Sequence, residues 1–108
     1  MAKINVGKAS EVGINKMIGV EVKGKFVLVA NVDGKYYGMQ GICSHAGGHL
    51  WEGKLTEFVV KCPRHGSEYD VRIGKVLKGP WVPFGKAHDL PVYNVSMEGD
   101  ELFAELPD

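Results

Sequence analysis

Four residues with metal-binding side chains lie in two short, glycine-rich stretches of this 108-residue chain. The first stretch reads Cys43-Ser44-His45, and the second, sixteen residues later, begins at Cys62 and contains His65. Thiolate and imidazole together suit Zn²⁺ or an iron–sulfur centre. This ligand set constrains the fold more than any other feature, because two stretches distant in sequence must be brought face to face.

The spacing of the four candidate ligands helps to choose between these metals. Structural zinc sites more often combine two closely spaced cysteines with two closely spaced histidines. Here each stretch holds one cysteine and one histidine. A [2Fe–2S] centre needs this mixed arrangement if one iron takes both cysteines and the other takes both histidines. A structural zinc module remains the alternative from a different functional class.

The hydrophobic pattern predicts an all-β fold. Apolar residues alternate with polar ones at residues 4–6 and 18–22, and residues 25–32 are apolar enough for a central strand. Asp33-Gly34 predicts a two-residue hairpin turn, because both positions tolerate a positive φ. Further strands are expected at residues 35–40, 58–60, 69–71, 76–77, 91–97 and 101–105. With 15 glycines between short strands and no helix longer than a turn, we expect a small antiparallel β-sandwich or barrel.

The charges balance in number but not in position. All 13 lysine and arginine residues lie in residues 1–88 with seven acidic residues, whereas residues 89–108 carry six acidic residues and no basic one. Either the oppositely charged segments pack together, or the acidic segment is a docking surface for a partner. No basic stripe with interleaved aromatic residues indicates a nucleic-acid site.

Length, cysteine content and hydropathy indicate where the protein works. The length fits a single domain at residues 1–108. Both cysteines lie in the ligand stretches, so no disulfide is needed, which fits a reducing compartment. The first residues lack the apolar core of a signal peptide, and the longest wholly apolar run (26–30) is far shorter than the ~20 residues of a membrane span. We expect a soluble, cytoplasmic protein that binds no membrane.

The two stretches closely resemble the cluster-binding loops of Rieske proteins. The residues that carry the resemblance are Cys43-Ser44-His45, Cys62-Pro63-Arg64-His65-Gly66-Ser67, Tyr69-Asp70 and Gly79-Pro80. The resemblance extends over roughly residues 3–105. The chain as a whole resembles a stand-alone Rieske-type ferredoxin. It implies an antiparallel β fold of Rieske type, in which a two-loop subdomain at about residues 41–84 holds the cluster at its tip.

The resemblance also implies the ligands of one [2Fe–2S] cluster. Cys43 and Cys62 would bind one iron, and His45 and His65 would bind the outer iron. With two neutral imidazoles among its ligands the oxidised cluster carries no net charge. Adding an electron is then easier than for a cluster held by four thiolates.

Two hydroxyl groups are expected to tune this cluster. Ser67 and Tyr69 match residues that donate to cluster sulfur and to ligand sulfur in high-potential respiratory Rieske proteins, and such donors stabilise the reduced state. The alternative is that they are a turn serine and a packed strand aromatic. The respiratory proteins also join their loops by a disulfide, but the matching positions here are Gly48 and Arg64. We therefore expect an intermediate potential.

The backbone around the ligands is expected to contribute as well. Gly47, Gly48 and Gly66 would let N–H groups turn toward the cluster. Pro80 and Pro83, with Trp81, would form a loop that covers one side of the cluster, although the aromatic residues of this loop could equally lie in the core.

A catalytic function would need a second site. Once the cluster takes two histidines, only His49 and His88 remain, whereas Rieske oxygenases add a mononuclear iron in a separate domain. No G-x-G-x-x-G motif indicates a nucleotide cofactor. We expect no enzyme but a monomeric one-electron carrier between a ferredoxin reductase and a terminal oxygenase or similar oxidoreductase. The alternative is an integral small subunit of a larger oxygenase or nitrite-reductase-type complex.

The histidine ligands predict a potential that depends on pH. Imidazoles lose a proton more readily when the irons are oxidised, so the midpoint potential should fall as the pH rises through the pKa values of the oxidised state. Protein-film voltammetry from about pH 6 to 10 measures this dependence, and a flat potential over that range would contradict the assignment of imidazole ligands.

Overall fold

The computed structural model describes residues 2–44, 47–81 and 85–107. Its strands, in chain order, are β1 (Ala2–Lys8), β2 (Lys16–Val22), β3 (Lys25–Val32), β4 (Lys35–Gln40), β5 (Lys54–Thr56), β6 (Val59–Lys61), β7 (Glu68–Asp70), β8 (Val76–Lys78), β9 (Val92–Tyr93), β10 (Val95–Glu98) and β11 (Glu101–Leu106). The described helical elements are two 3-10 turns, η1 (Ala9–Glu11) and η2 (Leu50–Glu52). The all-β prediction is confirmed.

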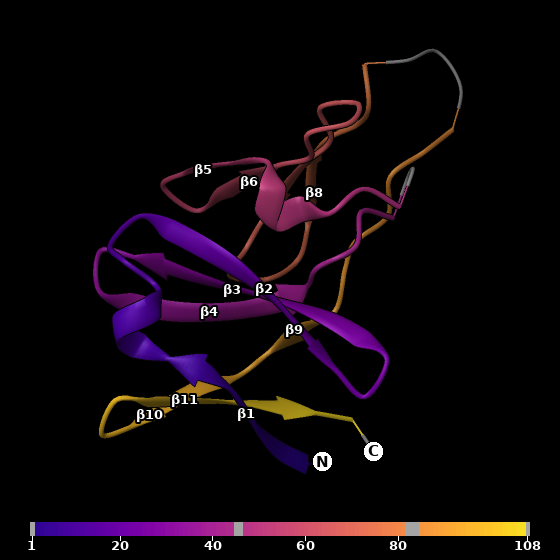
Figure 1. Ribbon diagram of the computed structural model, residues 1–108. Helices are drawn as coiled ribbons and strands as arrows, with labels where there is room; N and C mark the ends of the chain where they lie inside the picture. Colours follow the sequence, from indigo (N-terminus) through magenta and orange to yellow (C-terminus); the bar gives the residue numbers. More distant parts are fainter. Residues whose placement is uncertain (1, 45–46, 82–84, 108) are drawn as a thin grey trace.

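The strands form three antiparallel sheets that lie as layers, one above the other (Figure 1). We call them the terminal sheet (β1-β11-β10), the middle sheet (β2-β3-β4-β9) and the outer sheet (β5-β6-β7-β8). The middle sheet separates the outer sheet from the terminal sheet. Among the described residues, no helix has the length and apolar character to cross a membrane.

β3 lies at the centre because its side chains are buried on both faces. Leu28 and Ala30 belong to the hydrophobic core shared with the outer sheet. Val27 and Val29 belong to the core shared with the terminal sheet. Successive residues of a strand point to opposite faces, so one apolar run supplies both cores.

The predicted hairpin between β3 and β4 is present. Asp33 and Gly34 have φ values of 53° and 91°, as the two central positions of a primed turn require.

The prediction of a single strand at residues 91–97 is wrong. Its first part, β9, pairs with β4 in the middle sheet, whereas β10 pairs with β11 in the terminal sheet. The chain changes sheets at Asn94, whose carbonyl oxygen accepts from Glu105 N at 3.0 Å.

The acidic C-terminal segment packs against the first strand. β11 pairs with β1 along its length, and Lys3 Nζ contacts the Glu98 carboxylate. Asn5 Nδ2 donates to Glu101 Oε2 at 2.6 Å, and Ser10 Oγ donates to Asp100 Oδ2 at 2.7 Å. These contacts favour the interpretation that the oppositely charged segments pack together.

Trp51 lies in η2, an element that contacts β2 and β3 of the middle sheet and β6 of the outer sheet. A Cβ placed on Gly19 of β2 would lie 2.1 Å from Trp51 Cδ2, and one placed on Gly41 would lie 3.0 Å from Trp51 Cζ3. The rings of Phe26 and His49 stack with the same indole at centroid distances of 5.3 and 4.5 Å. Only glycine leaves room for this approach.

We predict that Gly19→Ala destabilises the fold by about 1–3 kcal/mol, since the added methyl group overlaps a packed ring. Gly13→Ala is the control, because a Cβ there would meet nothing nearer than Lys16 Cγ at 3.5 Å. Urea denaturation measures both free energies of unfolding. Equal values for the two variants would show that the Trp51 contact is not tight.

Candidate metal centre

Two loops carry the predicted ligands. The first ligand loop (residues 41–49) runs from β4 to η2, and the second (residues 62–67) joins β6 to β7. They therefore leave from different sheets, and the packing of the outer sheet on the middle sheet brings them together.

Both loops are closed in the same way. In each, the cysteine N–H donates to the carbonyl oxygen five residues on, and the cysteine carbonyl accepts from the N–H four residues on. These distances are 2.8 and 3.1 Å at Cys43 and 2.8 and 3.2 Å at Cys62. The donors at the fourth position, Gly47 and Gly66, have φ values of 67° and 77°, which a side chain disfavours. Glycine at both positions follows from this shared geometry.

The two cysteines are buried thiols that face one another. Cys43 is 3% exposed and Cys62 is 2% exposed, and neither forms a disulfide. The pKa of Cys62 is raised, chiefly by burial and also by the neighbouring Cys43 thiol. The backbone N–H groups of Arg64 and His65, which donate to its sulfur, act in the opposite direction and lower that pKa. Two desolvated thiols with backbone donors suit binding to a cationic metal, which offsets the charge of the thiolates.

The Tyr69 hydroxyl lies between the first loop and the core. Its oxygen is 3.3 Å from Cys43 Sγ and 2.9 Å from Ser44 Oγ. Burial, and then the contact with Cys43, raises the pKa of Tyr69 to about 12, so the hydroxyl keeps its proton near neutral pH. The structure thus places Tyr69 beside a predicted ligand sulfur.

Ser44 is a contact residue that the sequence did not single out. Its Oγ accepts from His88 N at 2.7 Å and lies 2.9 Å from His88 O. The side chain between two predicted ligands therefore ties the first loop to a segment 44 residues away. Its position inside the motif was visible in the sequence, but its distant partner was not.

Ser67 supplies the test of whether an iron–sulfur cluster fits. Its side chain is fully buried, and its Oγ is the one buried side-chain polar atom among the described residues without a hydrogen-bond partner. Burying a lone hydroxyl costs about 1–3 kcal/mol. A ligand with acceptor sulfur atoms would provide the partner. Together with the two thiols, this hydroxyl fits a [2Fe–2S] cluster.

The positions that match the respiratory disulfide also lie face to face. A Cβ on Gly48 would be 2.9 Å from Arg64 Cγ and 3.0 Å from Cys62 Sγ. The aliphatic stem of Arg64 thus packs over the glycine and connects the loops without a covalent bond.

Trp81 covers the second loop. Its backbone N–H donates to His65 O at 2.9 Å, and a Cβ on Gly66 would lie 2.1 Å from Trp81 Cε3. The side chain is 64% exposed, which excludes the alternative that Trp81 lies in the core. Pro80, immediately before it, is half-buried, whereas Pro83 lies outside the described residues.

The histidines differ in what the structure shows. His65 is half-buried in the same loop as Cys62, whereas His45 lies outside the described residues. Without His45, no three described His, Cys, Asp or Glu side chains lie close enough to hold one metal ion. His49 stacks on Trp51, as described above, and His88 is exposed.

Comparison with known proteins identifies this arrangement. Residues 2–100 match the family described as the Rieske [2Fe-2S] domain. The chain belongs to the Rieske [2Fe–2S] family. The cofactor of this Rieske domain is a [2Fe–2S] cluster.

Relatives of this Rieske domain include ferredoxins. The ferredoxin component of biphenyl 2,3-dioxygenase from Rhodococcus jostii (strain RHA1) is 33% identical over 107 residues, which are 98% of this chain and 94% of the relative. Sulredoxin from Sulfurisphaera tokodaii is 41% identical over 70 residues, 62% of each chain. A chain from the complex of reduced oxygenase and oxidized ferredoxin in carbazole 1,9a-dioxygenase superposes with a TM-score of 0.84 at 25% identity, covering 94% of this chain and 91% of that one.

We predict that Tyr69→Phe and Ser67→Ala each lower the midpoint potential by about 20–60 mV. Each variant removes a donor worth about 0.5–1.5 kcal/mol that favours the reduced state. Potentiometric titration of the purified variants measures the shift. Tyr93→Phe is the control, because Tyr93 belongs to the other core. Unchanged potentials in the two test variants would show that the hydroxyls only pack.

Proposed function

We propose that this Rieske domain is a one-electron carrier whose cluster is held by Cys43, His45, Cys62 and His65. The observation that carries the proposal is the pair of facing, buried thiols, which form no disulfide and come from two loops of matching geometry. The unpartnered Ser67 hydroxyl supports it. In this proposal the domain spans residues 1–108, and residues of about 41–84 form the cluster-binding subdomain.

When bound, the cluster supplies a centre that takes up and releases one electron. The chain's own residues set the conditions for that exchange. The two thiolates would balance the net positive charge of the oxidised iron–sulfide core, and the Tyr69 hydroxyl would donate toward Cys43 sulfur. Ser67 provides a further donor, and Gly47, Gly48 and Gly66 let the backbone approach closely. Pro80 belongs to the segment that shields one side of the site from water.

The partners follow from the relatives. A relative that is 33% identical is the ferredoxin component of a dioxygenase, and a similar structure is of a complex between an oxygenase and a ferredoxin. We propose that this chain accepts electrons from a ferredoxin reductase and delivers them to a terminal oxygenase, without transforming a substrate. Such electron-transfer contacts are small and transient. Two thiols that form no disulfide fit the reducing cytoplasm.

The spectrum and metal content of the purified protein test this function. We expect a red-brown protein with two irons and two inorganic sulfides per chain, which gives an electron paramagnetic resonance signal only when reduced. Cys62→Ser and His65→Ala should each lose the colour and the signal, whereas His88→Ala, which alters an exposed histidine, should keep both. A colourless wild-type protein that contains zinc would overturn the proposal, and stoichiometric co-purification with an oxygenase would favour an integral subunit.

A further inference from the structure

A row of charged side chains crosses the outer sheet at the end that carries the second ligand loop. The antiparallel register places Lys54 opposite Lys61, Lys61 opposite Glu68, and Glu68 opposite Lys78. Residues directly opposite each other project from the same face of a sheet. These four residues, which we call the charged row, thus present three positive charges and one negative charge on one face.

The charged row has an excess of positive charge that the fold does not require. Two like charges placed opposite each other on neighbouring strands destabilise a sheet, yet Lys54 and Lys61 are such a pair. Both lysines are exposed, as is Lys78, and none of the four residues forms an ion pair with another described residue. The opposite face of the same sheet is ordinary core, with Val60 and Tyr69 buried.

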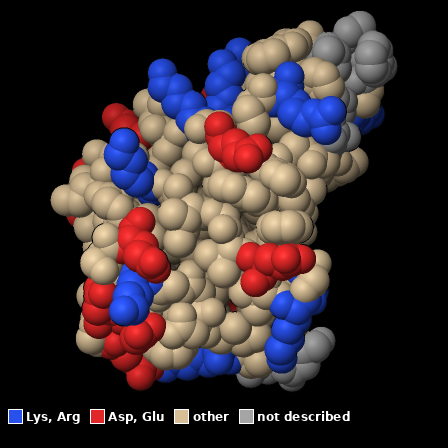
Figure 2. Space-filling model, in the orientation of Figure 1, with Lys and Arg blue, Asp and Glu red and all other residues tan. Residues whose placement is uncertain are grey.

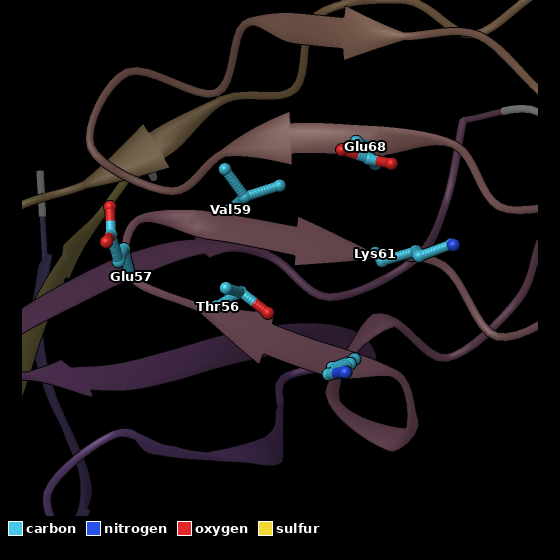
Figure 3. Close-up of a pocket in the computed structure, with 6 residues that line it drawn as sticks. Thr56, Glu57, Val59, Lys61 and Glu68 are labelled. Carbon is cyan, nitrogen blue, oxygen red and sulfur yellow. The ribbon is translucent and has the colours of Figure 1, made fainter.

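The charged row borders a shallow groove on the outer sheet. Figure 3 shows Thr56, Val59, Lys61 and Glu68 along neighbouring strands around it. The groove has a volume of about 450 Å³ and is lined by Lys54, Thr56, Glu57, Val59, Lys61 and Glu68. It offers a concave surface with lysines at one end, into which an acidic side chain of a partner can enter.

The same face continues into the second ligand loop. Lys61 immediately precedes Cys62 in the chain, and its Nζ lies 5.8 Å from the ring centroid of Trp81. That indole is exposed and lies on Gly66, as described above. Tryptophan is enriched among the anchor residues of protein interfaces. Charged row, exposed ring and ligand loop therefore form one continuous surface.

The outer sheet, which carries this surface, is the more positively charged end of the molecule. From residue 54 to residue 78 the chain has six basic residues and three acidic ones. Figure 2 shows lysine and arginine side chains gathered at the end where the outer sheet lies. In the terminal sheet, by contrast, acidic side chains contact Lys3, Asn5, Ser10 and Asn94.

We propose that the charged row and Trp81 form the docking surface for an acidic face of the redox partner protein. This inference rests on the proposed carrier function and adds the charge of the partner to it. Complementary charge accelerates encounter and orients the partner before contact. A partner held on this surface would lie against the second ligand loop, which contains His65, a proposed ligand of the cluster.

Electron transfer to and from small redox proteins of opposite charge tests the proposal. Stopped-flow absorbance would follow reduction of the oxidised holoprotein by an acidic flavodoxin in its hydroquinone state, and oxidation of the reduced holoprotein by a basic cytochrome c. For the double variant Lys54→Gln, Lys61→Gln, we expect the flavodoxin rate constant at low ionic strength to fall roughly tenfold. The cytochrome c rate constant should stay the same or rise. Isothermal titration of the oxidised protein with oxidised flavodoxin should show a parallel loss of affinity without any electron transfer.

The matched control is Lys23→Gln, Lys25→Gln, which removes the same charge beside the C-terminal end of β11. If both double variants lower the flavodoxin rate constant by the same factor, only net charge matters and the proposed docking surface is wrong. If neither loses rate or affinity while the cluster spectrum and potential are intact, the docking surface is wrong but the carrier function stands. Wild-type protein without a cluster would overturn the carrier function, and the docking proposal with it.

Discussion

The contact between the Trp51 indole and two glycines is the constraint on which the metal centre depends. Gly19 lies in the middle sheet and Gly41 at the start of the first ligand loop. One ring therefore packs against both the middle sheet and the start of the first ligand loop. Because protein interiors are closely packed, the first ligand loop cannot shift without disturbing this ring, and its Cys43 belongs to the same hydrophobic core as Cys62.

The features that could be predicted from the sequence are those encoded within a few residues. The turn at Asp33-Gly34 and the two ligand stretches have local signatures, and the structure contains the turn and brings the two cysteines together. The change of sheet at Asn94 has no such signature, because a strand pattern does not state which neighbour the strand pairs with. The same holds for the bonds from Ser44 to His88 and for β5, of which only Leu55 packs against the core. These depend on contacts between residues far apart in the chain.

The zero net charge of the chain conceals a separation of charge in space. Acidic side chains of the terminal sheet contact β1 and its neighbours, whereas the outer sheet keeps its lysines exposed. Net charge governs solubility, but the local field governs how two proteins approach each other. A neutral chain can therefore have a strongly polar end, and here that end adjoins the ligand loops.

The packing of Arg64 over Gly48 has a consequence for the setting in which this centre can work. The Arg64 stem packs across the two loops, backbone hydrogen bonds close each loop on itself, and the two cysteines of the chain form no disulfide. Cellular thiols, which cleave exposed or strained disulfides, find no bond to cut between the loops. The contact that joins the two ligand loops therefore contains no bond that reducing conditions would break, although the proposed function of the site is to carry an electron.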